Sequence, residues 1–320
     1  MKKIALNIIR VLVSLGLLLY LIYLSDVPQI IDLIKNVNPF SILLAVGAFL
    51  LSVLLMSKRW HLLLNSYGIL IKYHKLFIFY LIGLFFNNFL PTSIGGDLSR
   101  AYYLAQESSA RPASIGTVFL ERVIGLFATL SLAFIALFWS IDYFHSKRIV
   151  YITVFLVILV SLFLAIVMSR RLYRRFNGII SLITFYNIGD KIIKVFDILH
   201  YYRDKKIILA KAYFYSVLSQ FAFIFMNFVL ARGLGLMEVS LGYLFLVVPV
   251  TFVIGLLPSI NGLGVRDTGY VILLMRLGLE PSQILSLSFS VIIIPILISV
   301  FGGVFFLFYR HQGIQAPKLS

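Results

Sequence analysis

The sequence predicts an all-α polytopic membrane protein with about seven full spans or more and two re-entrant helical hairpins arranged as an inverted repeat. Of its 320 residues, 61% are hydrophobic and 12% are charged, against about 45–50% and about 25% in soluble domains. Apolar runs long enough for a helix to cross a bilayer recur along the chain, whereas a β-barrel would show alternating segments of about ten residues. Two shorter apolar stretches are interrupted by a proline and two glycines, which predicts the hairpins.

Nine apolar runs are candidates for helices in the membrane. They cover residues 4–24, 40–57, 76–90, 113–139, 149–168, 212–231, 240–257, 268–279 and 284–308. The first run follows a Lys-Lys pair and precedes no small-residue cleavage site, so Ile4–Leu24 is predicted to be a retained span and not a signal peptide. The runs at 76–90 and 268–279 are too short to cross the bilayer comfortably, and 240–257 is marginal.

The basic residues predict the orientation of the chain. With the N-terminus in the cytoplasm, 20 of the 28 Lys and Arg residues, Lys58 and Arg59 among them, fall on the cytoplasmic side and five fall outside. The other three lie at membrane depth and are Arg100, Arg122 and Arg266. This distribution requires residues 76–107 to enter the membrane from the cytoplasm and return to the cytoplasm. It likewise requires residues 240–279 to enter the membrane from outside and return to the outside. We expect a multi-pass protein of a bacterial or archaeal plasma (inner) membrane, with both termini cytoplasmic.

Residues 1–320 are predicted to form a single integral-membrane domain with a cytoplasmic insert at about 170–211. Four arginines lead the insert, and apolar residues follow at helical spacing with Lys191, Lys194 and Asp197 between them. This pattern is typical of amphipathic helices in the interface plane, while a solvated loop or a platform that collects headgroups would use the same residues. The net charge of +16 follows this topology and favours contact with anionic lipid, not nucleic acid.

An internal repeat links the two interrupted stretches. "LPTSIGGDLSRAYY" (Leu90–Tyr103) and "LPSINGLGVRDTGY" (Leu257–Tyr270) each begin with Leu-Pro and continue with a hydroxyl residue, two glycines, a charged pair and a tyrosine. Pro91 and Pro258 break the helices because proline lacks an N–H and clashes with the preceding turn. Hairpins that enter from opposite faces are the signature of an inverted repeat, which in transporters surrounds a site near the midplane.

Six ionisable residues are predicted to lie at membrane depth. They are Asp97, Arg100, Glu121, Arg122, Arg266 and Asp267. Each would cost about 2.5–3.5 kcal/mol if unpaired, so ion pairs are expected. Asp97 and Arg100 are three residues apart and share a helix face, whereas Glu121 and Arg122 point about 100° apart and need partners elsewhere. Caps and ion pairs between helices explain the same residues without a function, but a wet groove also tolerates them.

The N-termini of the helices that are predicted to begin again after Pro91 and Pro258 are suited to an anionic ligand. Freed backbone groups must line a wet cavity or be buried in protein, and a helix N-terminus with exposed glycine amides binds phosphate. The predicted substrate-binding residues are Asn88, Gly95, Gly96, Asp97, Arg100, Glu121, Arg122, Asn261, Gly262, Gly264, Arg266 and Asp267. No catalytic residue, metal or cofactor is predicted, because the five histidines are scattered and no nucleophile motif occurs.

Three motifs together resemble the signatures of the lysylphosphatidylglycerol synthase transmembrane-region family. They are "NNFLPTSIGGDLSRAYYL", "FLERVIGL" and "LLPSINGLGVRDTGY". This family includes the flippase domain of the bacterial multiple-peptide-resistance-factor proteins, and the resemblance implies a polytopic helical domain with paired re-entrant hairpins. Its motif positions map onto Asn88, Pro91, Gly95, Gly96, Asp97, Arg100, Glu121, Arg122, Pro258, Gly262, Gly264, Arg266 and Asp267. The full synthases add a soluble aminoacyltransferase domain after the membrane part. Because this sequence ends at Ser320, 12 residues after its last predicted span, the resemblance is expected to apply to the translocating part alone.

The expected function is translocation of a phospholipid or lipid-linked molecule between the leaflets through a polar groove. The expected cargo is an anionic phospholipid or an isoprenoid-linked lipid, with a second copy of the chain or a separate lipid-synthesising enzyme as a further partner. Two alternatives stay open at this point. One is a membrane enzyme or accessory subunit of a lipid-modifying pathway, of the phosphatidylglycerol lysyltransferase type. Buried carboxylates able to do acid/base work are the feature that keeps the enzyme open. The other alternative is an ion-coupled transporter of small solutes, which an inverted repeat permits and whose protons the buried charges could relay.

Overall fold

The computed structural model describes residues 15–89, 95–108, 111–140, 197–255 and 262–312, and five residues between 154 and 162. Within these ranges the regular structure is helical, as the composition predicts. The α-helices are α2 (Val27–Lys35), α3 (Pro39–Tyr67), α4 (Tyr73–Phe89), α5 (Gly95–Ser108), α6 (Arg111–Ser140), α10 (Lys206–Gly233), α11 (Leu241–Ile254), α12 (Val265–Leu274) and α13 (Pro281–Gln312). Short 3₁₀ turns precede α10 and follow α12.

Four of these helices are long and apolar enough to cross a membrane. They contain Pro39–Tyr67, Pro112–Ala136, Lys206–Gly233 and Pro281–Tyr309. A fifth candidate is the pair Leu15–Tyr23 and Val27–Lys35, which is bent by 92°. The described part of the chain therefore holds four or five candidate spans where the sequence predicts about seven or more, and the predicted span at 149–168 lies almost wholly outside it.

Local sequence signals explain where the helices begin and end. Asn38 accepts a hydrogen bond from the backbone N–H of Phe40 (2.9 Å), and Pro39 occupies the first turn of α3, a position that tolerates proline because its missing N–H has no partner there. Gly68 ends α3 in the left-handed region, with φ of 91°, which glycine adopts without strain. Ser240 caps α11 in the same manner as Asn38, accepting from the N–H of Tyr243 (3.2 Å).

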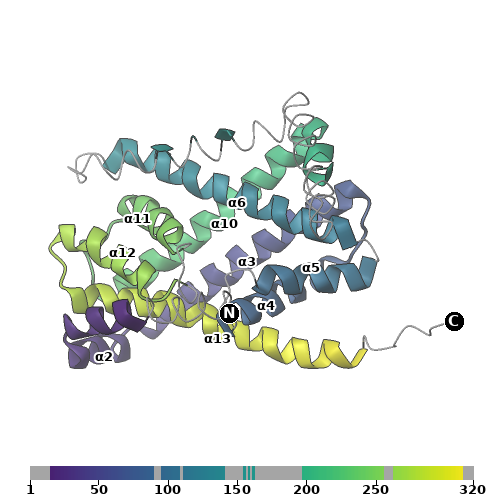
Figure 1. Cartoon of the computed structure of the whole chain (residues 1–320). Coiled ribbons are helices and arrows are strands. Elements are labelled where there is room, and N and C mark those ends of the chain that lie inside the picture. Colours follow the sequence, from purple (N-terminus) through teal and green to yellow (C-terminus); the bar gives the residue numbers. More distant parts are fainter. Residues whose placement is uncertain are drawn as a thin grey trace, which may run out of the picture.

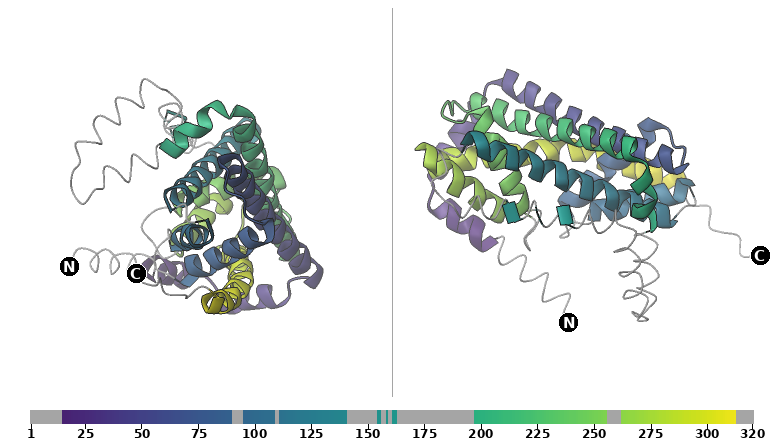
Figure 2. Two further views of the ribbon diagram at one scale, coloured as in Figure 1. Left: turned by 90° about the vertical axis from the view of Figure 1, so that its right-hand side faces the viewer. Right: turned by 90° about the horizontal axis from the view of Figure 1, so that it is seen from above.

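The pair α3 and α10 forms the spine of the molecule, and Figure 2 shows the two helices running side by side. Small residues such as Ala45 and Ala48 are buried on α3, which lets helix backbones approach closely in a membrane protein. Across the contact, the hydroxyls of Ser52 and Ser219 lie 3.0 Å apart, and both are buried. Hydrogen bonds of this kind join helices without exposing a polar group to lipid.

Two shorter helix pairs occupy opposite ends of this framework (Figure 1). The first pair consists of α4 and α5, with 17 and 14 residues, and the second pair consists of α11 and α12, with 14 and 10 residues. At about 1.5 Å per residue, none of the four reaches the roughly 30 Å thickness of a hydrocarbon core. These lengths suit half-way helices, while Pro91 and Pro258, the predicted break points, lie outside the described residues.

Helices α4 and α13 pack with almost no side chain between their backbones. A Cβ atom on Gly302 would collide with the carbonyl oxygen of Leu81, and one on Gly303 would lie 2.6 Å from the Phe85 ring. The glycines therefore set how closely the first helix pair approaches the last long helix.

We expect Gly302→Ala to lower the free energy of unfolding by about 1–3 kcal/mol, because the added methyl group forces the two backbones apart. Reversible unfolding of the purified protein in mixed micelles would measure the change. Gly47→Ala is the matched control: Gly47 also lies inside a helix, but a Cβ there meets nothing within 4 Å, so we expect a gain of up to about 1 kcal/mol. Equal effects of the two substitutions would contradict the close contact.

The described end of the predicted insert packs against the protein. Ile198 and Leu199 are buried, and Ile198 lies against Gly116 of α6. The buried hydroxyl of Tyr202 donates to the backbone oxygen of Leu63 (2.6 Å). These apolar positions are therefore covered by protein, and residues 206–211, predicted as part of the insert, form the first turns of α10.

Candidate functional site

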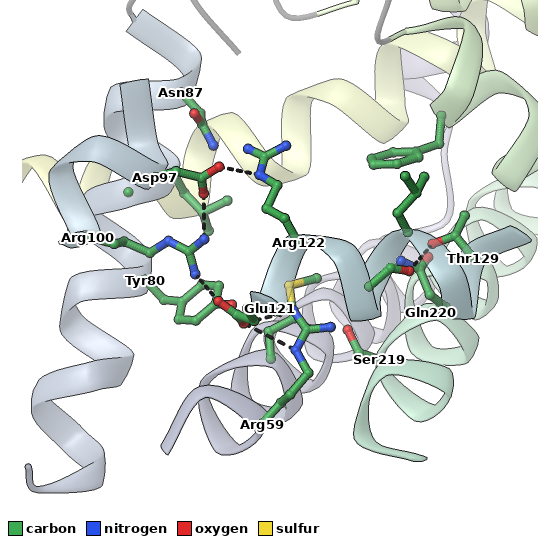
Figure 3. Close-up of a pocket in the computed structure, with 16 residues that line it drawn as sticks. Arg59, Tyr80, Asn87, Asp97, Arg100, Glu121, Arg122, Thr129, Ser219 and Gln220 are labelled. Atoms are coloured by element: carbon green, nitrogen blue, oxygen red, sulfur yellow. Dashed lines mark hydrogen bonds and ion pairs between the residues drawn. The ribbon is translucent and has the colours of Figure 1, made fainter. Parts of the chain in front are cut away.

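A polar cavity of about 270 Å³ lies where the first helix pair meets α3, α6, α10 and α11 (Figure 3). It is lined by Met56, Arg59, Tyr80, Gly83, Leu84, Asn87, Asp97, Arg100, Glu121, Arg122, Gly125, Leu126, Thr129, Ser219, Gln220 and Phe252. Five of the lining residues are charged, and Figure 3 shows that they face one another in a continuous chain of ion pairs. The structure thus brings four of the six predicted membrane-depth charges, Asp97, Arg100, Glu121 and Arg122, into one site.

Glu121 is the buried centre of the chain of ion pairs. Its Oε1 accepts from Nη2 (2.8 Å) and Nε (3.3 Å) of Arg59, and its Oε2 accepts from Nη1 of Arg100 (2.8 Å). The side chain is only 1% exposed. A carboxylate at that depth needs paired cations to offset the loss of its hydration, and two guanidinium groups from two other helices supply them.

Asp97 lies toward the more exposed end of this series of ion pairs. Its Oδ1 accepts from Nη2 of Arg100 (2.5 Å), and its Oδ2 accepts from Nε of Arg122. The spacing of three residues predicts the first of these pairs, and the second supplies Arg122 with the separate partner that its direction on α6 requires. Arg122 is the most exposed member, with 38% of its side chain accessible against 13% or less for the other four.

Arg100 connects the two carboxylates and lies against an aromatic wall. Its guanidinium carbon is 4.1 Å from the centre of the Tyr80 ring and 5.3 Å from that of Trp60. A planar guanidinium can bond carboxylates at its edge and stack on rings with its faces. Arg100 therefore joins α5, α6 and α4 through one side chain.

Arg59 is the charged residue of the cavity that the sequence did not predict. The prediction ended the span at residue 57 and placed Arg59 on the cytoplasmic side, but α3 continues to Tyr67 and Arg59 is buried inside it. Its Nη1 donates to the hydroxyl of Ser216 on α10 (2.7 Å) while its other nitrogens hold Glu121. A Lys-Arg pair after an apolar run is typical of a positive-inside flank, so the sequence contains no sign that Arg59 is buried in the cavity.

Glycine and asparagine shape the wall of the cavity beside Asp97. The backbone N–H of Gly96 donates to Oδ1 of Asn87 (2.8 Å), which supplies a partner in the first turn of α5. A Cβ on Gly96 would collide with the carbonyl oxygen of Gly83 on α4, so only glycine permits this approach. The neighbouring Gly95 is buried at the start of α5. Asn88 lies on α4, and it is Asn87 that lines the cavity.

The predicted residues of the second helix pair form a separate cluster. Gly262 and Gly264 have φ of 79° and 75°, and α12 begins at Val265. Asp267 is fully buried; its Oδ2 accepts from the N–H of Gly264 (2.8 Å), and its Oδ1 accepts from the hydroxyl of Ser288. Asp267 thus caps α12 and ties it to α13. Asn261 lies outside the described residues.

Arg266 differs from every arginine of the cavity. Its Nε and Nη2 are buried and have no hydrogen-bond partner in the part of the chain that the structure describes. It occupies the first turn of α12, where the positive end of the helix dipole disfavours a cation. A buried donor without a partner costs about 1–3 kcal/mol, so an anion at this position would satisfy both the charge and the N–H groups.

A metal site finds no support in the described ranges, where His, Asp and Glu side chains form no group of three or more able to hold an ion. The helices that are able to cross a membrane, and the ion-paired cavity among them, define a helical integral membrane protein. The chain belongs to the family described as the lysylphosphatidylglycerol synthase TM region, whose model matches residues 7–306.

Relatives of this chain occur among archaeal membrane proteins. A UPF0104 membrane protein of Methanocaldococcus jannaschii is 24% identical over 296 residues, which cover 88% of each chain. A UPF0104 membrane protein of Methanothermobacter thermautotrophicus is 29% identical over 146 residues, covering 44% of this chain and 43% of the relative. One of Pyrococcus horikoshii is 23% identical over 157 residues, covering 48% and 47%.

Proposed function

We propose that this chain moves a phospholipid or lipid-linked molecule between the two leaflets, with the headgroup passing through the polar cavity. The observation that carries the proposal is the chain of ion pairs in that cavity. Five charged side chains from α3, α5 and α6 would be costly in a purely structural contact, and a wall built of arginine suits a phosphate because the guanidinium fork binds its oxygens in pairs.

The size and surroundings of the cavity support a headgroup as the moving part. A volume of about 270 Å³ lies below the roughly 300–1,000 Å³ of sites that enclose a whole drug-sized ligand. Because the cavity is this small, the charged side chains would hold the polar headgroup within it while the lipid tails remain outside in the bilayer.

The arrangement of the two helix pairs supports the proposed route. The helices of both pairs are too short to cross the bilayer, and the pairs lie at opposite ends of the framework (Figure 1). The second helix of each pair has a carboxylate in its first turn, Asp97 at the cavity and Asp267 fully buried. We infer that the two pairs are re-entrant hairpins related as an inverted repeat, a design that places a site near the midplane. Arg266 would then offer phosphate a second contact after the cavity.

Leaflet exchange in proteoliposomes tests the proposal. We expect the purified chain to expose fluorescent phospholipid from the inner leaflet to a membrane-impermeant quencher, and Arg122→Gln to slow this exchange by about tenfold, as expected if one charge-assisted hydrogen bond worth about 1.5–3 kcal/mol is lost. Arg122 is suitable because it is the most exposed charged residue of the cavity. Lys58→Gln is the control, since Lys58 is exposed on α3. Proteoliposomes that exchange no faster than empty vesicles would refute the function.

A further inference from the structure

An apolar cavity of about 380 Å³ lies between α2 and α13 and shares no lining residue with the ion-paired cavity. Figure 1 shows α2 beside the first turns of α13. The described residues that line the apolar cavity are Ile22, Val27, Ile30, Ile31, Ile34, Leu263, Phe289, Ile292 and Ile293. The four on α2 recur at the spacing of one helix face. The volume falls within the range of sites that enclose a small ligand, so the packing of the two helices leaves room for one.

The apolar cavity opens to the outer surface of the helices. Ile31 and Ile293, one from each wall, are 48% and 41% exposed, whereas Ile30 is 5% exposed and forms part of the interior. Helix α13 is one of the candidate spans, and its exposed apolar side chains suit contact with lipid. Once the chain is in a membrane, the cavity is therefore accessible from the hydrocarbon of the bilayer.

Polar contacts at the start of α13 indicate how deep the apolar cavity lies. The side chain of Gln29 donates to the carboxylate of Glu280 (3.3 Å) and accepts from the hydroxyl of Ser282. Exposed polar groups of this kind belong at the edge of the hydrocarbon core, because burying them in lipid is costly. The lining residues Phe289 and Ile293 follow the start of α13 by two to three turns, which is roughly 12–18 Å at about 1.5 Å per residue. That is the depth of lipid tails in a core about 30 Å thick.

The lining of the apolar cavity excludes polar occupants. A buried water molecule needs about two to four hydrogen-bond partners, and the lining residues within the described ranges offer no polar side chain. A headgroup would lose its hydration there without compensation. A hydrocarbon chain from the adjoining bilayer loses no hydrogen bond on entry, and it gains dispersion contacts with walls that otherwise face empty space.

We propose that this cavity binds one acyl chain of a bilayer phospholipid, whatever its headgroup. The acyl chain packs between the apolar face of α2 and the side chains of α13, and it reaches Leu263. Leu263 lies between Gly262 and Gly264, and the N–H of Gly264 is held by Asp267 (2.8 Å). A bound tail therefore supports the turn that begins α12. This inference needs the chain to lie in a membrane but does not depend on lipid translocation.

Photo-labelling by phosphatidylcholine with a diazirine on one acyl chain, followed by peptide mass spectrometry, tests the site. In proteoliposomes of the full chain, we expect adducts at Ile30, which is 5% exposed and lines the cavity, and at Leu297, which is 59% exposed on α13 and does not line it. Ile292→Trp fills part of the cavity. We expect it to lower the ratio of Ile30 to Leu297 adducts at least about tenfold, the effect of excluding about two methylene groups from apolar contact. Phe301→Trp is the control, because Phe301 is 63% exposed on the same helix and lies outside the cavity.

A second variant keeps the test decisive if Ile292→Trp does not fold. Ile31→Trp narrows the opening from its exposed rim, where a larger side chain has room, and is expected to lower the same ratio. An unlabelled Ile30 beside a labelled Leu297, or a ratio that neither Trp substitution changes, would overturn the proposal.

Two further measurements distinguish a lipid tail from other occupants. Phosphatidylglycerol with the same labelled chain is expected to give a ratio within about twofold of that for phosphatidylcholine, because apolar contact is non-directional and independent of the headgroup. A strong preference for either lipid would contradict recognition of the tail alone. The sequence contains no cysteine, so Ile31→Cys reports on a second copy of the chain. Efficient formation of a disulfide-linked dimer in the membrane would place another chain over the opening and overturn the proposal.

Discussion

Arg100→Ala is expected to lower the free energy of unfolding by about 3–5 kcal/mol, the range found when one partner of a buried ion pair is removed. Arg100 is the only residue that bonds both carboxylates of the cavity among those that the structure describes, at 2.8 Å to Glu121 and 2.5 Å to Asp97. Its removal leaves Glu121, 1% exposed, with one cation and opens a void against the Tyr80 ring. Both effects destabilise the folded chain.

Equilibrium unfolding in mixed micelles, followed by circular dichroism, measures this loss. Arg203→Ala is the matched control, because Arg203 pairs with Asp204 (3.0 Å), whose side chain is 71% exposed, and pairs of this kind contribute about 1 kcal/mol or less. Arg100→Lys keeps the charge but loses the fork that reaches both carboxylates, so we expect an intermediate loss. A loss below 1 kcal/mol in Arg100→Ala would mean that the ion-pair chain does not hold α5 to α6.

The difference between Arg100 and Arg59 shows which parts of the site can be predicted from sequence. Asp97 and Arg100 share one helix, so their spacing alone predicts their contact (2.5 Å). Arg59 meets Glu121 across 62 positions of sequence, and no local pattern encodes that pairing. Arg59 is absent from the six residues expected at membrane depth, so the sequence-based prediction left out one of the five charged residues that line the cavity.

The repeat illustrates a second limit of sequence reasoning. Similar breaks suggest that both charged pairs serve one cleft, yet Asp267 is satisfied by Gly264 (2.8 Å) and Ser288 and is absent from the cavity wall. The order of charges explains the difference. In the first pair, the acid precedes the arginine by three residues and can bond it, whereas Arg266 and Asp267 are adjacent and diverge. Similar composition at two breaks therefore produces two different environments.

Arg266→Met is expected to act in the opposite direction to Arg100→Ala, raising the free energy of unfolding by about 1–3 kcal/mol. The substitution removes buried N–H groups that have no partner within the described ranges, each costing about that amount, and it removes a cation from the positive end of α12. The thioether chain keeps most of the packing. At the same time we expect exchange to slow by roughly 100-fold, because two potential phosphate contacts are lost.

The same unfolding experiment and the proteoliposome assay, run on one preparation, separate the possible outcomes. Arg232→Met is the control: Arg232 donates to the backbone oxygen of Met237 (2.8 Å) and lies over the Phe228 ring, so losing it is expected to cost stability. If Arg266→Met is less stable than the wild type, the guanidinium of the wild-type Arg266 has hydrogen-bond partners when the protein is in the membrane. If it is more stable and exchanges lipid normally, Arg266 has no part in the route. Only a gain of stability joined to a loss of exchange fits an arginine left unsatisfied by the fold so that a passing phosphate can satisfy it.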